Sequence, residues 1–151
     1  MPSIESVAKA LLINNQGEAL ILTIGEHKEQ PHRSFKPDLP GGMVDPGENE
    51  HQAVVREISE ETGIQVAATE LVMAYSRTQF IVEENKSVTK HLFIANLIGK
   101  PDVRLSWEHS AYEWVKLESL QDQVLRSFYD EAIEYCFSNG VLKNQPDTDL
   151  Q

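Results

Sequence analysis

Cysteine is nearly absent from this sequence of 151 residues, and because Cys136 is its one example an internal disulfide is excluded. The N-terminus also lacks an apolar stretch long enough for a signal peptide or a membrane span. Glycine and proline are scarce, with 8 and 7 residues, whereas 40% of the chain is hydrophobic, so a buried core is expected and a disordered chain is not. These absences favour a globular protein of the cytoplasm that does not bind a membrane.

Basic residues are few: 13 Lys and Arg stand against 24 Asp and Glu, giving a net charge of -11. This balance argues against a protein that binds long nucleic acid along its phosphate backbone. Six acids crowd into residues 42–64, where they need cations or water to be tolerated: Asp45, Glu48, Glu50, Glu57, Glu60 and Glu61. A small phosphate compound could still bind there through a metal ion.

The length of 151 residues fits one domain, which we assign to residues 1–143, followed by a short polar tail at residues 144–151. A β-hairpin is predicted from Val7–Ile13 and Ala19–Ile24, and a long polar loop follows at residues 25–37. Further strands are predicted from β-branched and aromatic residues at Leu71–Tyr75, Gln79–Val82, His91–Leu97 and Tyr112–Val115.

Residues 49–62 are good helix formers, with Asn49 placed to cap the N-terminus and Gly63 to stop the C-terminus. A second helix is predicted where Ser127 opens an S-x-x-D capping pattern. Apolar residues follow there at helical spacing: Leu125, Phe128, Ala132, Ile133, Cys136 and Phe137. Both segments are therefore expected to pack one face on a core.

The first helix carries the candidate chemistry. At about 100° per residue, Glu57, Glu60 and Glu61 fall on one face, whereas Val54, Val55 and Ile58 point away from it. Three crowded carboxylates repel one another, so they either bind cations or form a solvated face. An oxygen-only ligand set favours Mg²⁺ or Mn²⁺ over Zn²⁺ or copper.

The segment before this helix is rich in turn residues. Gly41 and Gly42 permit a sharp turn or a close approach to a ligand, and Pro46-Gly47 makes a further turn. Arg56 lies among the acids and could pair with Glu48, which would hold the loop against the helix. Its predicted role is structural.

Residues 42–64 resemble the Nudix box, whose pattern is Gly, five residues, Glu, seven residues, Arg-Glu, an aliphatic, one residue, Glu-Glu, one residue, Gly and an aliphatic. Every fixed position is matched, by Gly42, Glu48, Arg56, Glu57, Ile58, Glu60, Glu61, Gly63 and Ile64. The resemblance implies an α/β fold, an α/β/α sandwich around a mixed β-sheet. It also implies a Mg²⁺- or Mn²⁺-dependent pyrophosphohydrolase, in which water attacks phosphorus and cleaves the diphosphate linkage of a nucleotide or nucleoside diphosphate derivative.

Carried over residue by residue, the resemblance implies that Glu57, Glu60 and Glu61 are the metal ligands. Glu48 and Arg56 would orient the site, and Gly42 and Gly63 would shape its ends. Candidate catalytic residues are Glu61, Glu60 and Glu108, with Glu61 or Glu108 as the base. Glu108 lies in a stretch similar to a loop of MutT-type members, and the nearby Glu113 is its rival.

A non-catalytic, Nudix-like nucleotide-binding module is the alternative function. Such modules commonly lose box glutamates, and all are present here, which favours an enzyme with a small nucleotide substrate. The resemblance also makes a homodimer possible, and no substrate-binding residue is assigned.

For other polar and aromatic residues we prefer a structural interpretation to a functional one. Lys28, Arg33 and Lys36 are expected in a solvated loop, and His91 and Cys136 in packing. Four aromatic residues are expected in the core rather than against a base: Phe35, Tyr75, Phe80 and Trp107.

Overall fold

The computed structural model describes residues 2–143, so the tail predicted at residues 144–151 lies outside the described residues. The N-terminal hairpin is present, with β1 at Ser3–Ile13 and β2 at Glu18–Ile24. Its turn is closed by the Asn14 side chain, which accepts hydrogen bonds from the backbone N–H of Gln16 and Glu18 at 2.9 and 3.0 Å. Local turn chemistry therefore fixes the first hairpin.

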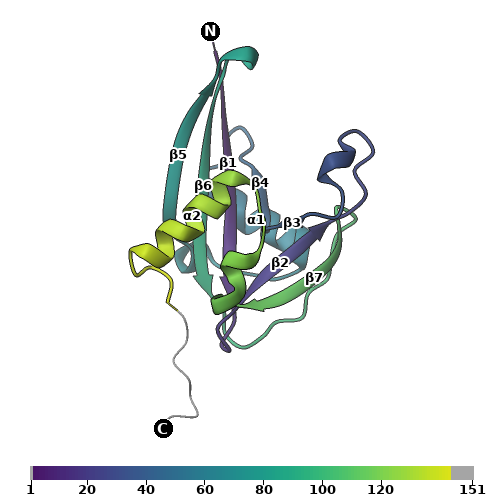
Figure 1. Ribbon diagram of the computed structural model, residues 1–151, viewed down its shortest axis with the longest axis vertical. Helices are drawn as coiled ribbons and strands as arrows, with labels where there is room; N and C mark the ends of the chain where they lie inside the picture. The colour runs from purple at the N-terminus through teal and green to yellow at the C-terminus, as the bar shows by residue number, and fades with distance from the viewer. Residues whose placement is uncertain (1, 144–151) are drawn as a thin grey trace.

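β1 lies in the middle of a mixed sheet (Figure 1). It pairs antiparallel with β2 and with β4 (Gly41–Met43), and parallel with β6 (Lys86–Asn96). β5 (Val72–Ile81) pairs with β6 at one edge, while β3 (Pro37–Asp38) and β7 (His109–Lys116) both pair with β2. The parallel pair within an otherwise antiparallel sheet confirms the expected mixed topology.

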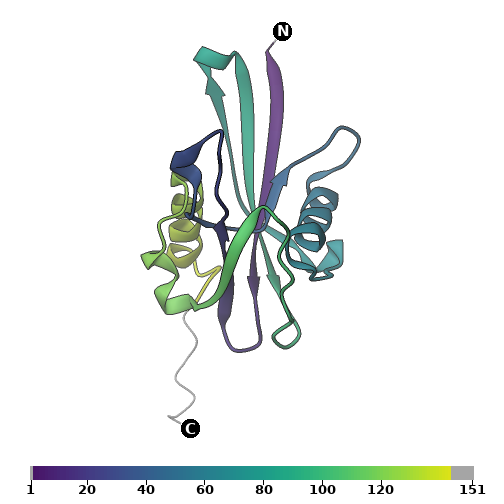
Figure 2. The same cartoon turned by 90° about the vertical axis from the view of Figure 1, so that its right-hand side faces the viewer.

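Two helices cover opposite faces of the sheet, α1 at Glu50–Thr62 and α2 at Ser127–Ser138. Figure 2 shows them on either side of the strands, α1 in blue-teal and α2 in yellow-green. The sheet separates two buried clusters, and the alternation along β1 places Leu12 in the α1 cluster and Leu11 in the α2 cluster. The fold is the expected α/β/α sandwich.

Short 3-10 turns join these elements at Pro31–Arg33, Ala68–Glu70, Val82–Glu84 and Leu117–Asp122. The predicted loop at residues 25–37 is closed at its base, because Phe35 N–H donates to Ile24 O at 2.8 Å and Ile24 N–H donates to Lys36 O at 2.9 Å. Neither described helix is long and apolar enough to cross a membrane.

Two predicted elements differ from the structure. The separate strands expected at residues 71–75 and 79–82 form one edge strand, β5, because its polar middle is exposed and still pairs with β6. The capping pattern at Ser127 is also wrong: Arg126 occupies the cap position without a side-chain cap bond. Asp130 instead accepts a hydrogen bond from Leu125 N–H at 3.0 Å, outside the helix.

The expected burial of aromatic residues is only partly correct. Tyr75 packs against the cluster under α2, but Phe35, Phe80 and Trp107 are 64%, 51% and 91% exposed, respectively. Burial of His91 and Cys136 is confirmed. The exposed Trp107 lies in the loop before β7, so an aromatic residue is available at the surface beside the site described next.

Candidate active site

Local sequence fixes both ends of α1. The Asn49 side chain accepts from Gln52 N–H, and the Gln52 side chain accepts from Asn49 N–H, each at 2.8 Å, so the predicted N-cap is part of a reciprocal capping box. At the other end Gly63 has φ +74°, a left-handed conformation that favours glycine. The register of the glutamates along α1 is therefore set by short-range signals.

The strand β4 brings two glycines against the carboxylates of α1. Gly41 N–H donates to Glu61 Oε1 at 3.4 Å, and a Cβ added at Gly42 would lie 2.8 Å from Glu57 Oε1. Any side chain at residue 42 would have to displace Glu57. The close approach predicted for the glycine pair is therefore an approach to the protein's own glutamates.

Arg56 holds the loop and the helix together. Its guanidinium contacts Glu48 twice, Nη2 to Oε1 at 2.7 Å and Nε to Oε2 at 3.2 Å, and this bidentate pair raises the pKa of Arg56. Arg56 Nη1 also donates to Glu57 Oε1 at 3.1 Å and Glu60 Oε2 at 3.3 Å. Arg56 Nη2 also lies 3.3 Å from Asp45 Oδ2, so the predicted pairing with Glu48 is present and one cation partly offsets four acids.

The three glutamates of α1 differ in depth, although periodicity gives them one face. The Glu61 side chain is 2% exposed, Glu57 15% and Glu60 58%. Among residues 2–143 no three Asp, Glu, His or Cys side chains are gathered as a metal site. Arg56 bonds Glu57 and Glu60, and Glu61 lies deeper than both.

Glu61 meets an unexpected partner, His109, at the start of β7. His109 Nδ1 lies 3.7 Å from Glu61 Oε2, both atoms are buried, and neither has a hydrogen-bond partner among the described residues. Burial, and then the neighbouring Glu57 carboxylate, raise the pKa of Glu61 well above the usual range of a carboxyl group. Such a carboxyl group is suited to accepting a proton or binding a cation.

A chain of buried contacts orients His109. Its Nε2 donates to Asp38 Oδ2 at 3.0 Å, and Lys9 Nζ lies 2.6 Å from Asp38 Oδ1. Burial alone would raise the pKa of Asp38, but the hydrogen bond from His109 and the charge of Lys9 hold it at about 2. Asp38 is therefore an ionised anchor that directs Nδ1 of His109 toward Glu61.

Sequence reasoning missed all three of these residues. Lys9 carried a signal, because it is a lone charge within the apolar run of β1 and such a charge needs a buried partner. Asp38 and His109 gave no comparable signal, since their pairing joins β3 to β7 across 71 positions of the chain.

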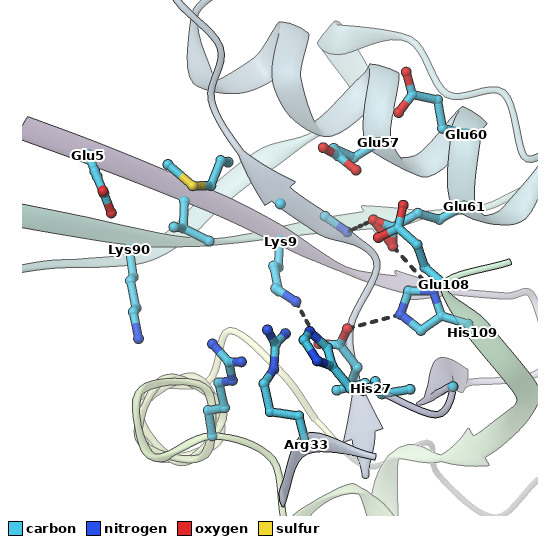
Figure 3. Close-up of a pocket in the computed structure, with 18 of the residues that line it drawn as sticks. Glu5, Lys9, His27, Arg33, Glu57, Glu60, Glu61, Lys90, Glu108 and His109 are labelled. Carbon is cyan, nitrogen blue, oxygen red and sulfur yellow. Dashed lines mark hydrogen bonds and ion pairs between the residues drawn. The ribbon is translucent and has the colours of Figure 1, made fainter. Parts of the chain in front are cut away.

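These residues line one cavity of about 590 Å³. Figure 3 shows Glu57, Glu60, Glu61 and Glu108 around it. Glu108 lines the cavity beside Trp107, whereas Glu113 points to solvent from β7 and does not line it. The position of Glu108 thus favours it over its rival.

The donors fit a divalent cation. Buried polar atoms without a partner are uncommon in folded proteins, and Glu61 Oε2 is such an atom at the cavity wall. Glu57 and Glu60 also line the cavity and add carboxylate oxygens, the ligands that Mg²⁺ and Mn²⁺ prefer.

The chain matches the sequence model of the NUDIX domain over residues 5–136. A curated Bacillus subtilis (strain 168) protein named "Putative 8-oxo-dGTP diphosphatase" is 40% identical over 78 residues, 52% of this chain and 48% of the relative. The asymmetrical bis(5'-nucleosyl)-tetraphosphatase of Mus musculus is 38% identical over 80 residues, 52% of this chain and 54% of the relative. The chain thus spans about half the length of these curated relatives.

A solved structure is similar over a longer span. The crystal structure of a MutT protein from Methanosarcina mazei Go1 superimposes with a TM-score of 0.75 at 30% identity, covering 94% of this chain and 98% of that one. The family match extends well beyond the box, from β1 into α2. The chain therefore belongs to the Nudix family.

Proposed function

We propose that the chain is a divalent-metal-dependent pyrophosphohydrolase that cleaves the diphosphate linkage of a nucleotide or nucleoside diphosphate derivative. The observation that carries the proposal is the buried, partnerless Oε2 of Glu61 at the wall of a cavity that Glu57, Glu60 and Glu108 share. Members of the family generally use divalent metals such as Mg²⁺ or Mn²⁺.

Glu57, Glu60 and Glu61 would hold the cation, exchanging the contacts of Glu57 and Glu60 with Arg56 for contacts with metal. When bound, the metal supplies neutralisation of the charge that develops at phosphorus and acidification of water. Arg56 would keep its bidentate contact with Glu48 and so hold the box loop during this exchange.

The protein's own carboxylates supply the base. Glu61 Oε2 and Glu108 both line the cavity, and either can take the proton from the water that attacks phosphorus. Asp38 and His109 would fix the position of Glu61, because His109 Nδ1 faces its Oε2. Cleavage then leaves two phosphorylated fragments.

The test is phosphate release, after coupling to a phosphatase or pyrophosphatase, on a panel of nucleoside triphosphates, sugar nucleotides, ADP-ribose and dinucleoside polyphosphates with Mg²⁺ or Mn²⁺. We expect activity on at least one compound and its near-complete loss in Glu61→Gln. Glu113→Gln is the matched control, since this exposed glutamate on β7 lies outside the cavity.

Full activity of Glu61→Gln at saturating metal would overturn the assignment of Glu61. The alternative, a module that binds nucleotides without cleaving them, predicts heat of binding in calorimetry with the same panel and no phosphate release. Retention of all the box carboxylates favours the enzyme.

A further inference from the structure

The cavity that holds the glutamates has a second, basic side. Figure 3 shows Lys9, Arg33 and Lys90 across from Glu57, Glu60 and Glu61, and Lys86 and Arg126 line the same cavity. These cations come from a chain whose net charge is -11. The charge of these basic side chains around one cavity is therefore opposite in sign to the net charge of the chain.

Two of these cations are already neutralised within the protein. Lys9 Nζ lies 2.6 Å from Asp38, and Lys86 Nζ lies 3.2 Å from Glu5 and 3.0 Å from Glu84. Their partners Asp38 and Glu5 line the same cavity, so each of these two acids already has a cation as its partner. Glu26, which is exposed, also lines the cavity.

Arg33, Lys90 and Arg126 remain, and none of them forms an ion pair with a residue in the described part of the chain. Arg33 donates to Gln30 Oε1 at 3.3 Å, but its Nε is buried without a partner. Three cations that line one side of a cavity without an ion-pair partner among the described residues form a place where an anion from outside can bind.

Arg126 lies close enough to both Arg33 and Lys90 for its charge to disfavour theirs. Burial, and then the charge of Arg126, lower the pKa of the Arg33 guanidinium, while the charge of Asp38 acts in the opposite direction. Burial also lowers the pKa of Lys90, followed by the charges of Arg126, Lys9 and Arg77. An anion bound among them would relieve this repulsion.

The basic surface continues past the first cavity. Arg33 and Arg126 also line an adjoining cavity of about 580 Å³, together with His32 and Lys36 from the 25–37 loop. The two arginines therefore stand between two cavities and can contact a ligand that extends from one into the other.

We propose that Arg33, Lys90 and Arg126 form a phosphate subsite and that the substrate carries a chain of three or more phosphates. This inference rests on the proposed function, because it takes the scissile linkage to lie at the carboxylates. Because the cations line the cavity across from the glutamates, a longer phosphate chain can place its remaining phosphates on the arginines, whose forked donors suit phosphate oxygens. Nucleoside polyphosphates fit this description, and sugar nucleotides and ADP-ribose do not.

The first test is calorimetric and needs no catalysis. The full chain, in EDTA, is titrated with inorganic tripolyphosphate and with inorganic phosphate as the short comparison. EDTA removes any metal that could bind the probe at the carboxylates, which Arg56 offsets only in part, so the titration reports on the basic side of the cavity. We expect tighter binding of tripolyphosphate, weakened on the order of tenfold by Arg33→Gln, Lys90→Gln or Arg126→Gln, since each removes a charged hydrogen-bond donor.

Lys28→Gln is the matched control, because this exposed lysine belongs to the same loop as Arg33 and lines neither cavity. A variant is compared with the wild type only if the two proteins have the same thermal midpoint. Arg126→Gln is the variant expected to disturb the fold least, because Arg126 is exposed. Equal affinity for both probes in the wild type, or an equal loss in Lys28→Gln, would overturn the subsite.

Kinetics then separate this inference from the proposed function. The ratio of kcat/KM for a nucleoside triphosphate to that for ADP-ribose should fall on the order of tenfold in Arg126→Gln. Turnover with an unchanged ratio contradicts the subsite alone. Tripolyphosphate binding that depends on the three cations, with no turnover of any compound, contradicts the proposed function alone.

Discussion

The buried pair of Lys9 and Asp38 allows one stability prediction to be worked through. The two side chains are 10% and 15% exposed, and Nζ lies 2.6 Å from Oδ1. A carboxyl group whose pKa falls from 3.8 to about 2 on folding contributes about 2 kcal/mol at neutral pH. Asp38→Asn also leaves the Lys9 ammonium buried without a counter-charge, so we expect a loss of roughly 2 to 4 kcal/mol in the free energy of unfolding.

The sign of the pH dependence follows from the direction of this shift. Because folding lowers the pKa of Asp38, its stabilisation is fully present above pH 3.8 and is lost as the pH falls toward 2. Urea denaturation followed by circular dichroism, from pH 7 down to pH 3, should therefore show the stability difference between the wild type and Asp38→Asn narrowing by about 1 kcal/mol at the acidic end.

Two controls test whether burial of the pair causes the loss. Glu131→Gln breaks the exposed ion pair between Glu131 and Arg77, whose two side chains are 43% and 47% exposed, and should lower the free energy of unfolding by less than about 1 kcal/mol. Adding Lys9→Met to Asp38→Asn removes the stranded charge and should restore part of the loss. A loss below about 1 kcal/mol for Asp38→Asn, or a difference independent of pH, would refute the argument.

Two further predictions concern the cavity. Gly42→Ala should lower kcat/KM on the order of tenfold with little change in thermal midpoint, because the new Cβ would displace the Glu57 carboxylate and not a core side chain. A normal rate on the substrate identified by the panel would contradict this prediction. ATP should quench the tryptophan fluorescence of the wild type but not that of Trp107→Ala, because Trp107 is 91% exposed at the cavity whereas Trp114 packs against the core. Equal quenching in both proteins would exclude Trp107 as a stacking surface.

Short-range signals account for the part of the site that the sequence predicts. The cap at Asn49, the stop at Gly63 and the spacing of the glutamates lie within one turn or one helix, so local geometry determines them. Pairing of Arg56 with Glu48 spans eight residues of a compact loop and helix, and it was predicted too. The β-prone runs and the turn between them likewise predicted β1 and β2, whereas the sandwich was expected from the resemblance to the Nudix family.

Tertiary packing decided what the sequence could not show. Periodicity cannot tell that Glu61 is buried while Glu60 is exposed, because β4 and His109 cover only one edge of the helix face. The middle of β5 is polar, as in a turn, yet an edge strand tolerates exposed polar residues while it pairs on one side. Trp107 is exposed where its size alone predicts burial, because it lies on the loop that borders the cavity.

The two sides of the cavity have different origins along the chain. The acidic side chains of the box come from one continuous segment, whereas Arg33, Lys90 and Arg126 come from a loop, a strand and the start of a helix. A substitution at any one basic position leaves the backbone that carries the glutamates untouched. Single substitutions at the basic positions can therefore change which ligand the cavity prefers, while the segment that would carry out the chemistry stays the same.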